Sequence, residues 1–216
     1  MPSSLLTPVI ILALGLAAGV AVGPATCSAA GVGADRSWAP AFDCDKADGM
    51  VEEMICADSI LAALDVELDE VWQRVLALSQ ENPDLDMIRA EQRGWIKGRN
   101  ECWKSGDVRY CVWTTYKQRI AELQALWRLV PSDGPYFFAC DGNPANEVVA
   151  TFYETDPRVA VTERGDQTVV AYLEPSQSGE RYEGRNVTFW LKGDVALLVW
   201  GVDGDLMKCS LRLRRE

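Results

Sequence analysis

Hydrophobic and polar positions repeat at two different spacings along the chain, and the change comes near residue 130. From Lys46 to Gln80 the apolar positions fall three or four residues apart, which is typical of one face of an amphipathic helix. This stripe consists of Val51, Met54, Ile55, Leu61, Leu64, Leu68, Val71, Val75 and Leu78. Asn82-Pro83-Asp84 interrupts it, and helical spacing resumes over 85–99 and 111–128. The first part of the chain therefore predicts a three-helix bundle.

The second part of the chain, after a short linker, alternates between apolar and polar residues. Its segments are rich in Val, Thr, Tyr, Phe and Trp, and Gly, Asn and Asp separate them. The eight candidate strands are 136–140, 146–153, 158–163, 167–174, 179–183, 186–191, 194–200 and 206–212. Eight short strands predict a closed antiparallel barrel or a sandwich. Cys140 ends the first strand and Cys209 lies in the last, so a bridge between them favours a barrel, which closes where first and last strands meet.

The pattern of residues at the N-terminus predicts an export signal. The apolar run 8–22 is shorter than the ~20 residues that span a bilayer, and Ser28-Ala29-Ala30 has the form of a signal-peptidase site. No Lys or Arg precedes the run, so a retained anchor stays open. Alternatively, Cys27 is the lipid-bearing first residue of a lipoprotein, although Pro24-Ala25-Thr26 is a poor lipobox. We expect an exported protein, either periplasmic or a membrane-anchored lipoprotein of a bacterial envelope.

Six cysteines remain once Cys27 is set aside, and an even number in an oxidising compartment predicts disulfides. Four of them lie in the helical part, where both early cysteines come near both later ones in an antiparallel hairpin. Two pairings stay open: Cys44–Cys102 with Cys56–Cys111, or the crossed pairs. Zinc is the rival interpretation, but its ligands usually come in close C-x₂₋₄-C pairs, which are missing. We therefore expect no metal and no other cofactor.

Net charge and the types of residue present exclude several classes of function for this chain. The chain has 21 basic and 32 acidic side chains, a formal net charge of −11, which disfavours nucleic acid and favours basic partners. Membrane attachment is expected only through a lipid on Cys27. The absence of histidine excludes a Ser–His–Asp triad, and no Ser-x-x-Lys motif occurs at Ser178. No pair of carboxylates is singled out for glycoside cleavage either, so we expect a protein that is not an enzyme.

Two sets of motifs resemble known families. The helical part contains Phe42-Asp43-Cys44-Asp45-Lys46-Ala47, Glu53-Met54-Ile55-Cys56, Leu64-Asp65, Glu91-Gln92-Arg93-Gly94-Trp95 and Arg99-Asn100-Glu101-Cys102, which resembles the N-terminal domain of the LprI family. The second part contains Tyr136, Cys140-Asp141-Gly142, Ser178-Gly179-Glu180-Arg181-Tyr182, Phe189-Trp190-Leu191-Lys192-Gly193 and Cys209, which is similar to the MliC/PliC family of c-type lysozyme inhibitors. The resemblance covers nearly all of 42–212.

Domain boundaries follow from the patterns and the resemblance together. The expected fold class is α+β in two domains, a disulfide-linked three-helix bundle followed by an eight-stranded antiparallel β-barrel. We place a signal peptide or lipoprotein signal at 1–30, a tether at 31–42, an LprI-like helical domain at 43–130, a linker at 131–135 and an MliC-like barrel domain at 136–216.

The resemblance to the inhibitor family implies a mechanism and a partner, a basic c-type lysozyme of a host. In that family a serine loop enters the lysozyme cleft and hydrogen-bonds the catalytic carboxylates, supported by a lysine. Carried over, these residues are Ser178 and Lys192, the latter followed by Gly193. Gly179 would let the backbone turn close to the partner, and Tyr182 would brace the loop. A serine hydroxyl and a lysine ammonium suit a cleft that holds two carboxylates, because hydrogen bonds from these groups to a carboxylate are charge-assisted and strong.

A second hypothesis belongs to a different class. The chain could be a non-inhibitory envelope-binding module for peptidoglycan or another protein, led by the helical domain. It predicts binding by residues 42–130 alone, unaffected by changes at Ser178 and Lys192.

Overall fold

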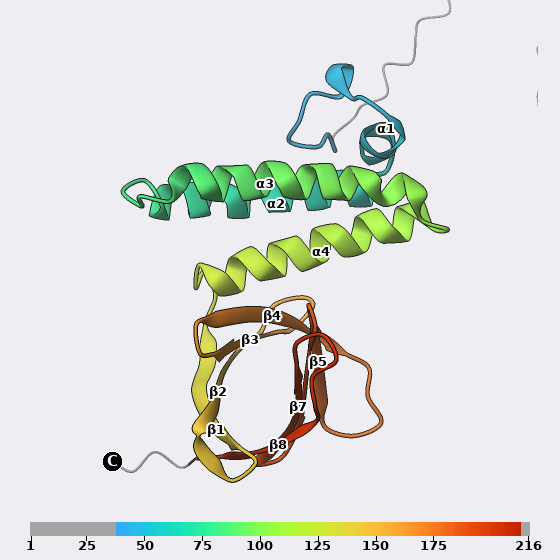
Figure 1. Ribbon diagram of the computed structural model, residues 1–216. Helices are drawn as coiled ribbons and strands as arrows, with labels where there is room; N and C mark the ends of the chain where they lie inside the picture. Colours follow the sequence, from blue (N-terminus) through green and yellow to red (C-terminus); the bar gives the residue numbers. More distant parts are fainter. Residues whose placement is uncertain (1–37, 213–216) are drawn as a thin grey trace, which may run out of the picture. The chain divides into compact units, whose positions relative to one another are not determined.

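The computed structural model describes residues 38–212. The predicted signal segment, Cys27 and most of the predicted tether lie outside the described residues. The helical domain contains the 3-10 turn η1 (Cys44–Lys46), α1 (Met50–Ala57), α2 (Ser59–Leu78), α3 (Leu85–Asn100), the turn η2 (Glu101–Lys104) and α4 (Val108–Leu126) (Figure 1). No helix in 38–212 combines the length and the apolar character needed to cross a bilayer.

The first predicted helix is two helices, and the bundle therefore has four α-helices rather than three. The break lies at Asp58, whose Oδ1 accepts hydrogen bonds from the N–H groups of Ile60 (2.9 Å) and Leu61 (3.2 Å) and so caps the N-terminus of α2. A short polar side chain that bonds the backbone in this way starts a new helix. The apolar spacing continues across the break because Ile55 of α1 and Leu61 of α2 are both buried in one core.

Both pairings expected for the helical cysteines are wrong. The structure joins Cys44 to Cys56 and Cys102 to Cys111, which are 12 and 9 residues apart. The reason is local: η1 folds back onto α1, and η2 lies a few residues before the first turn of α4. Each bridge therefore closes a short loop next to a helix end instead of joining the two ends of the hairpin.

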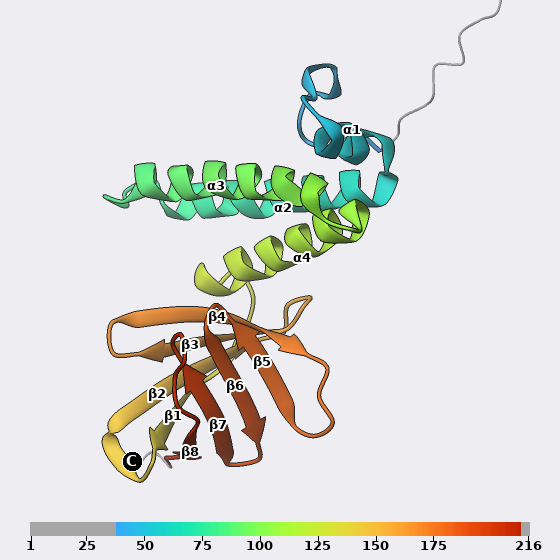
Figure 2. The same ribbon diagram turned by 45° about the vertical axis from the view of Figure 1, so that its right-hand side comes forward.

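The predicted barrel is confirmed. Its strands are β1 (Ser132–Cys140), β2 (Asn143–Tyr153), β3 (Val159–Arg164), β4 (Gln167–Glu174), β5 (Glu180–Gly184), β6 (Val187–Lys192), β7 (Val195–Trp200) and β8 (Met207–Leu211). Each strand pairs with the next, and β8 pairs with β1 to close the sheet (Figures 1 and 2). The first strand begins earlier than expected, at Ser132, so most of the predicted linker at 131–135 belongs to β1.

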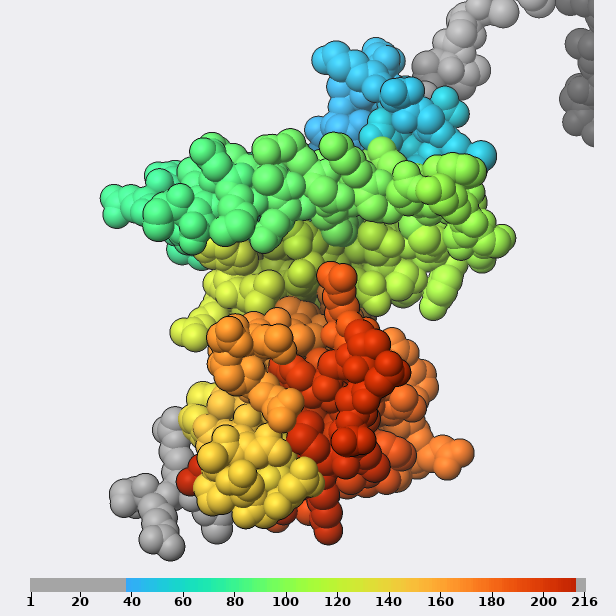
Figure 3. Space-filling view, in the orientation of Figure 1, coloured from blue at the N-terminus to red at the C-terminus, as the bar shows by residue number. Residues whose placement is uncertain are grey.

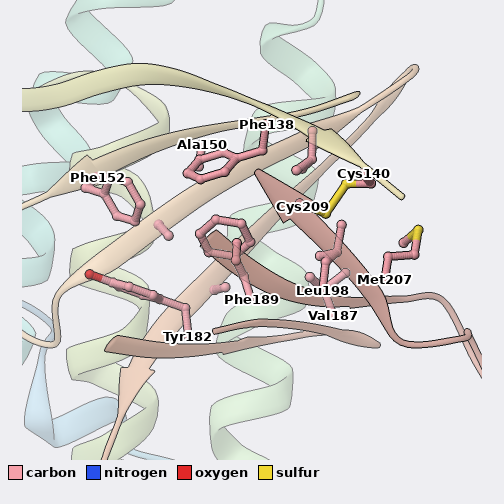
Figure 4. Close-up of a cluster of buried hydrophobic side chains, with 14 residues drawn as sticks. Phe138, Cys140, Ala150, Phe152, Tyr182, Val187, Phe189, Leu198, Met207 and Cys209 are labelled. Carbon is pink, nitrogen blue, oxygen red and sulfur yellow. A yellow bond between two sulfur atoms is a disulfide. The ribbon is translucent and has the colours of Figure 1, made fainter. Parts of the chain in front are cut away.

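The interior of the barrel is aromatic and apolar. Alternation along the strands turns Phe138, Phe152, Tyr182 and Phe189 inward, where they are buried together (Figure 4). Phe138 and Phe189 meet edge to face with their ring centroids 5.4 Å apart. The expected bridge between Cys140 and Cys209 is present and joins directly opposed residues of β1 and β8. The covalent closure of the barrel therefore coincides with its hydrogen-bonded closure.

The last helix of the bundle contacts the barrel. Ala121 and Ala125 of α4 are buried with Val159 and Val161 of β3. The Nζ of Lys117 lies 2.7 Å from an Asp156 carboxylate oxygen at the border of this contact. The two alanines let the helix lie close to the sheet, since their side chains are small.

Candidate functional site: the β4–β5 loop and Lys192

Four of the five residues predicted to contact lysozyme lie on the β4–β5 loop (175–179), at the end of β6 and in the turn that follows it, and the fifth, Tyr182, lies in β5. Register brings these segments together, because Glu180, the first residue of β5, pairs with Leu191, which precedes Lys192. In Figure 2 the β4–β5 loop and the β6–β7 turn lie at the same end of the barrel. Figure 3 shows orange atoms of this loop projecting from the edge of the barrel.

The loop backbone is held by two side-chain donors. The Ser176 hydroxyl donates to the carbonyl oxygens of Gly179 (2.7 Å) and Ser178 (3.3 Å). The indole N–H of Trp190 also donates to the carbonyl of Ser178, at 2.7 Å. Ser178 itself is exposed, and its hydroxyl has no hydrogen-bond partner within residues 38–212. The loop thus fixes the backbone of Ser178 and leaves its hydroxyl available to a partner.

Gly179 is a position that only glycine fits. Its φ is +67°, in the left-handed region that disfavours side chains. A Cβ placed there would lie 2.2 Å from the carbonyl oxygen of Leu191 and 3.2 Å from Cγ of Lys192. The loop backbone is therefore packed directly against the segment that carries Lys192.

Trp190 connects the two predicted contact residues. The Nζ of Lys192 lies 3.6 Å from the centroid of the Trp190 ring, a cation–π contact. The guanidinium of Arg181 lies 5.9 Å from the same ring, and Arg181 also forms an ion pair with Glu183. Lys192 is exposed and has no ion pair with a carboxylate in the part of the chain that the structure describes. One indole therefore positions both the Ser178 backbone and the Lys192 ammonium.

Tyr182 acts on the loop from inside the barrel. It is fully buried, its ring centroid lies 5.4 Å from that of Phe152, and it points into the core (Figure 4). Its hydroxyl donates to Glu180 Oε2 at 3.0 Å, and Arg158 donates to the other oxygen of that carboxylate at 2.7 Å. Burial raises the pKa of Tyr182, and the Glu180 carboxylate adds to the rise, so the hydroxyl stays protonated and donates. Tyr182 offers no surface to a partner.

The structure separates the five predicted contact residues into two groups. Ser178, Gly179, Lys192 and Gly193 are exposed, and Gly193 lies in the turn after β6 with a φ of +61°. Only Tyr182 is internal. Our sequence reasoning assigned no role to Trp190, although a signal existed. Alternation along β6 places Trp190 and Lys192 on the outer face, opposite buried Phe189.

Comparison with known proteins finds family models that match both domains. Residues 44–123 match the family model described as "Lysozyme inhibitor LprI". Residues 138–207 match the model described as "Membrane-bound lysozyme-inhibitor of c-type lysozyme", MliC. The chain is LprI-like, with an LprI-type domain followed by an MliC-type domain. Proteins named lipoprotein LprI from Mycobacterium bovis and from two strains of Mycobacterium tuberculosis are 28% identical over 158 residues, which is 72% of this chain and 78% of each relative.

The family matches coincide with the structural elements. The LprI match runs from η1 into α4 and contains both helical disulfides. The MliC match begins in β1, ends at the start of β8 and contains the β4–β5 loop with Lys192. Both family descriptions are of inhibitors, and neither is of an enzyme. Across residues 38–212 no cluster of three potential metal-ligating side chains occurs.

Proposed function

We propose that this chain inhibits a c-type lysozyme by inserting the β4–β5 loop and Lys192 into the active-site cleft of that enzyme. The observation that carries the proposal is the double contact of Trp190, which donates to the Ser178 carbonyl and lies under the Lys192 ammonium. The exposed Ser178 and the exposed Lys192 are thereby both held by one indole at the same edge of the barrel. The match of the barrel to a family of c-type lysozyme inhibitors supports the same function.

The chemistry of the target explains why these two groups inhibit it. Lysozyme cleaves its substrate with two acidic side chains, one a general acid and the other a nucleophile or electrostatic stabiliser. The Ser178 hydroxyl would donate to one carboxylate, and the Lys192 ammonium would pair with the acidic site. Such charge-assisted hydrogen bonds contribute about 1.5–3 kcal/mol each. Occupied carboxylates are unable to protonate or attack the glycosidic bond.

The rest of the surface favours encounter with a basic enzyme. The net charge of −11 attracts a cationic partner over distances of about a Debye length. Association should therefore slow as salt rises, whereas the short contacts of Ser178 and Lys192 should persist. We infer that the general charge accelerates association and that the loop determines the site of binding.

The test is a lysozyme activity assay on bacterial cell walls, titrated with the chain and its variants. Wild type should reach full inhibition at a fixed stoichiometry. Ser178→Ala combined with Lys192→Ala should weaken inhibition at least about tenfold, since two charge-assisted contacts are lost. Gly179→Ala should weaken it similarly, because the added Cβ meets the Leu191 carbonyl and moves the loop.

A matched control removes the same chemical groups elsewhere on the barrel. Thr168→Ala with Lys208→Ala deletes one exposed hydroxyl and one exposed ammonium outside the loop, and inhibition should stay at the wild-type level. Full lysozyme activity in excess wild-type chain would refute the proposal. Equal losses in the loop variant and the control would show that overall charge, and not the loop, is responsible.

We also infer that the chain is exported to the bacterial envelope. The relatives are named lipoproteins, and the MliC family is described as membrane-bound. The six paired cysteines suit an oxidising compartment. Cell fractionation of the full chain beside Cys27→Ser tests the anchor. A lipid on Cys27 predicts that the substitution moves the protein from membrane to soluble fractions, and an unchanged distribution would exclude a lipid at that residue.

A further inference from the structure

The helical domain contains a cavity of about 540 Å³ that the proposed inhibition does not use. It lies between α2, α3 and the segment that leads into α1, elements that lie beside one another in Figures 1 and 2. The volume is within the range of small-molecule sites, roughly 300–1,000 Å³. Asp65, Asp69 and Trp72 line it from α2 at helical spacing, and Gln92 and Trp95 line it from α3.

The floor of this cavity is a preformed polar network. Arg99 is 4% exposed, and its guanidinium donates to the Tyr116 hydroxyl (2.6 Å) and to Glu52 (3.2 Å) and lies 3.7 Å from Asp65. Asp65 also accepts from Tyr116 at 2.7 Å and from the N–H of Ala41 at 2.8 Å. These charges satisfy one another, so the floor is rigid and needs no ligand to hold it together.

Two polar side chains on the cavity wall, Gln92 and Asp69, keep part of their hydrogen-bonding capacity free within the described chain. Gln92 is 8% exposed, and its Oε1 accepts two hydrogen bonds from Arg119, which leaves its Nε2 amide as a donor. Asp69 is half-buried and accepts a hydrogen bond from Gln73 on Oδ1 alone in the described chain. A ligand in the cavity would therefore meet one amide donor and one carboxylate acceptor.

The remaining walls are aromatic. Phe42, Trp72 and Trp95 line the cavity and are each only partly buried. Trp95 is fixed edge to face against Tyr116, with ring centroids 5.3 Å apart, and Arg99 lies 5.8 Å from its ring. Flat aromatic surfaces held in place beside a few polar groups suit a ligand with an apolar face and polar edges.

Charge selects among such ligands. The cavity is lined by four carboxylates and two cations, so phosphates and other anions are repelled. The cavity also offers few free carboxylates to a cationic ligand. Glu52 and Asp65 are paired with Arg99, and Asp43 is paired with Lys46. Only Asp69 has no cation partner among the lining groups within residues 38–212. A neutral ligand rich in hydroxyl and amide groups fits this arrangement best.

We propose that the cavity of the helical domain binds a neutral N-acetylated saccharide. The C–H face of a pyranose ring stacks on Trp72 or Trp95, Asp69 accepts from sugar hydroxyls, and the Gln92 amide donates to an acetamido carbonyl. This site is separate from the β4–β5 loop and does not depend on the proposed inhibition. It would hold the chain on glycan of the kind that lysozyme cleaves.

The test is titration of the full chain with N,N′,N″-triacetylchitotriose, followed by calorimetry and by tryptophan fluorescence. Wild type should bind with a shift in fluorescence. Trp72→Ala should weaken binding about tenfold, as expected for a lost stacking surface. Asp69→Ala removes a polar group from the cavity wall and leaves the apolar core of the domain intact. It should weaken saccharide binding several-fold. Trp103→Ala deletes an exposed tryptophan of the same domain outside this cavity and should bind like wild type.

Several results would overturn the proposal. Absence of heat and fluorescence change in wild type up to about 10 mM saccharide excludes the site. Wild-type affinity for the saccharide in both Asp69→Ala and Trp72→Ala would also exclude the site. Binding of oligolysine, and not of the saccharide, would exclude it as well. Lysozyme inhibition by Trp72→Ala and Asp69→Ala should equal that of wild type. The two proposals therefore fail separately, because each pair of variants affects one assay only.

Discussion

The two domains present opposite shapes to their surroundings. The barrel carries its candidate contact residues on a projecting loop and on the adjacent end of β6, where Trp190 contacts both the Ser178 carbonyl and Lys192. The helical domain instead has a hollow of about 540 Å³ lined by aromatic rings. A projecting edge suits the cleft of another macromolecule, whereas a hollow suits a small ligand. We propose that the two domains recognise different classes of partner, although both match families described as lysozyme inhibitors.

The cores of the two domains differ as well. The barrel interior is built from aromatic and aliphatic side chains and is closed by one bridge between residues 69 positions apart. The helical domain has two bridges over short loops and a buried cation, Arg99, among carboxylates. The barrel should therefore depend most on its long-range bridge, and the helical domain on its charges.

Removal of the barrel bridge should have the largest effect on stability. In the chain-entropy model, Cys140→Ser with Cys209→Ser should lower the free energy of unfolding by about 4 kcal/mol. Cys44→Ser with Cys56→Ser opens a much shorter loop and should cost about 3 kcal/mol. Urea unfolding followed by hydrogen exchange reports the two domains separately. If the helical double variant lost as much or more free energy of unfolding, loop length would not explain the contributions of the two bridges.

The cysteines also show what the sequence could and could not predict. Cys140 and Cys209 could be paired because a barrel has one closure point, and alternation located the strands. The helical pairs were missed because both bridges are local: η1 folds back onto α1, and η2 lies just before α4, so neither bridge joins the two ends of the hairpin. The fold class was therefore accessible from periodicity, whereas the pairing depended on short turns next to helix ends, which periodicity does not reveal.

The candidate site shows the same limit. Motif resemblance located Ser178, Gly179 and Lys192, but the contact between Trp190 and the Ser178 carbonyl joins residues 12 positions apart through space. The cavity of the helical domain was not predicted either. It depends on side chains from separate segments, and periodicity does not show which of them meet around one hollow.

The second prediction concerns the buried charge of the helical domain. Arg99→Met removes the cation and leaves Glu52 and Asp65 without a counterion, so the helical domain should lose about 3 kcal/mol. Arg109→Met is the matched control, because Arg109 is about half exposed and its ion pair with Asp58 should stabilise the domain far less than the buried contacts of Arg99 do. Urea midpoints measure both. Similar losses in the two variants would mean that burial of Arg99 adds nothing.

The smallest effect should appear in the response to acid. The hydrogen bond from Arg109, the largest cause, holds the pKa of Asp58 below its ordinary value. Burial raises the pKa of Glu52, but the Asp48 N–H, Asn100 and Arg99 outweigh it and lower the pKa overall. Both carboxyl groups belong to the helical domain. A carboxyl group whose pKa is lowered by folding stabilises the protein above its unfolded pKa, and this contribution is lost as pH falls below about 4.

The helical domain should therefore weaken in acid before the barrel does, and one substitution isolates the share of Asp58. Asp58→Asn keeps a side chain that can cap α2 but ends the pair with Arg109, so it should cost less than about 1 kcal/mol near neutral pH. Near pH 3 the variant and wild type should converge, because Asp58 is then largely protonated in the unfolded chain and increasingly so in the folded one. Asp84→Asn is the control, since Asp84 precedes α3 without a side-chain capping bond and its substitution should leave the stability near neutral pH unchanged. A constant gap between wild type and Asp58→Asn across this range would show that the charge of Asp58 contributes nothing and that the cap alone begins α2.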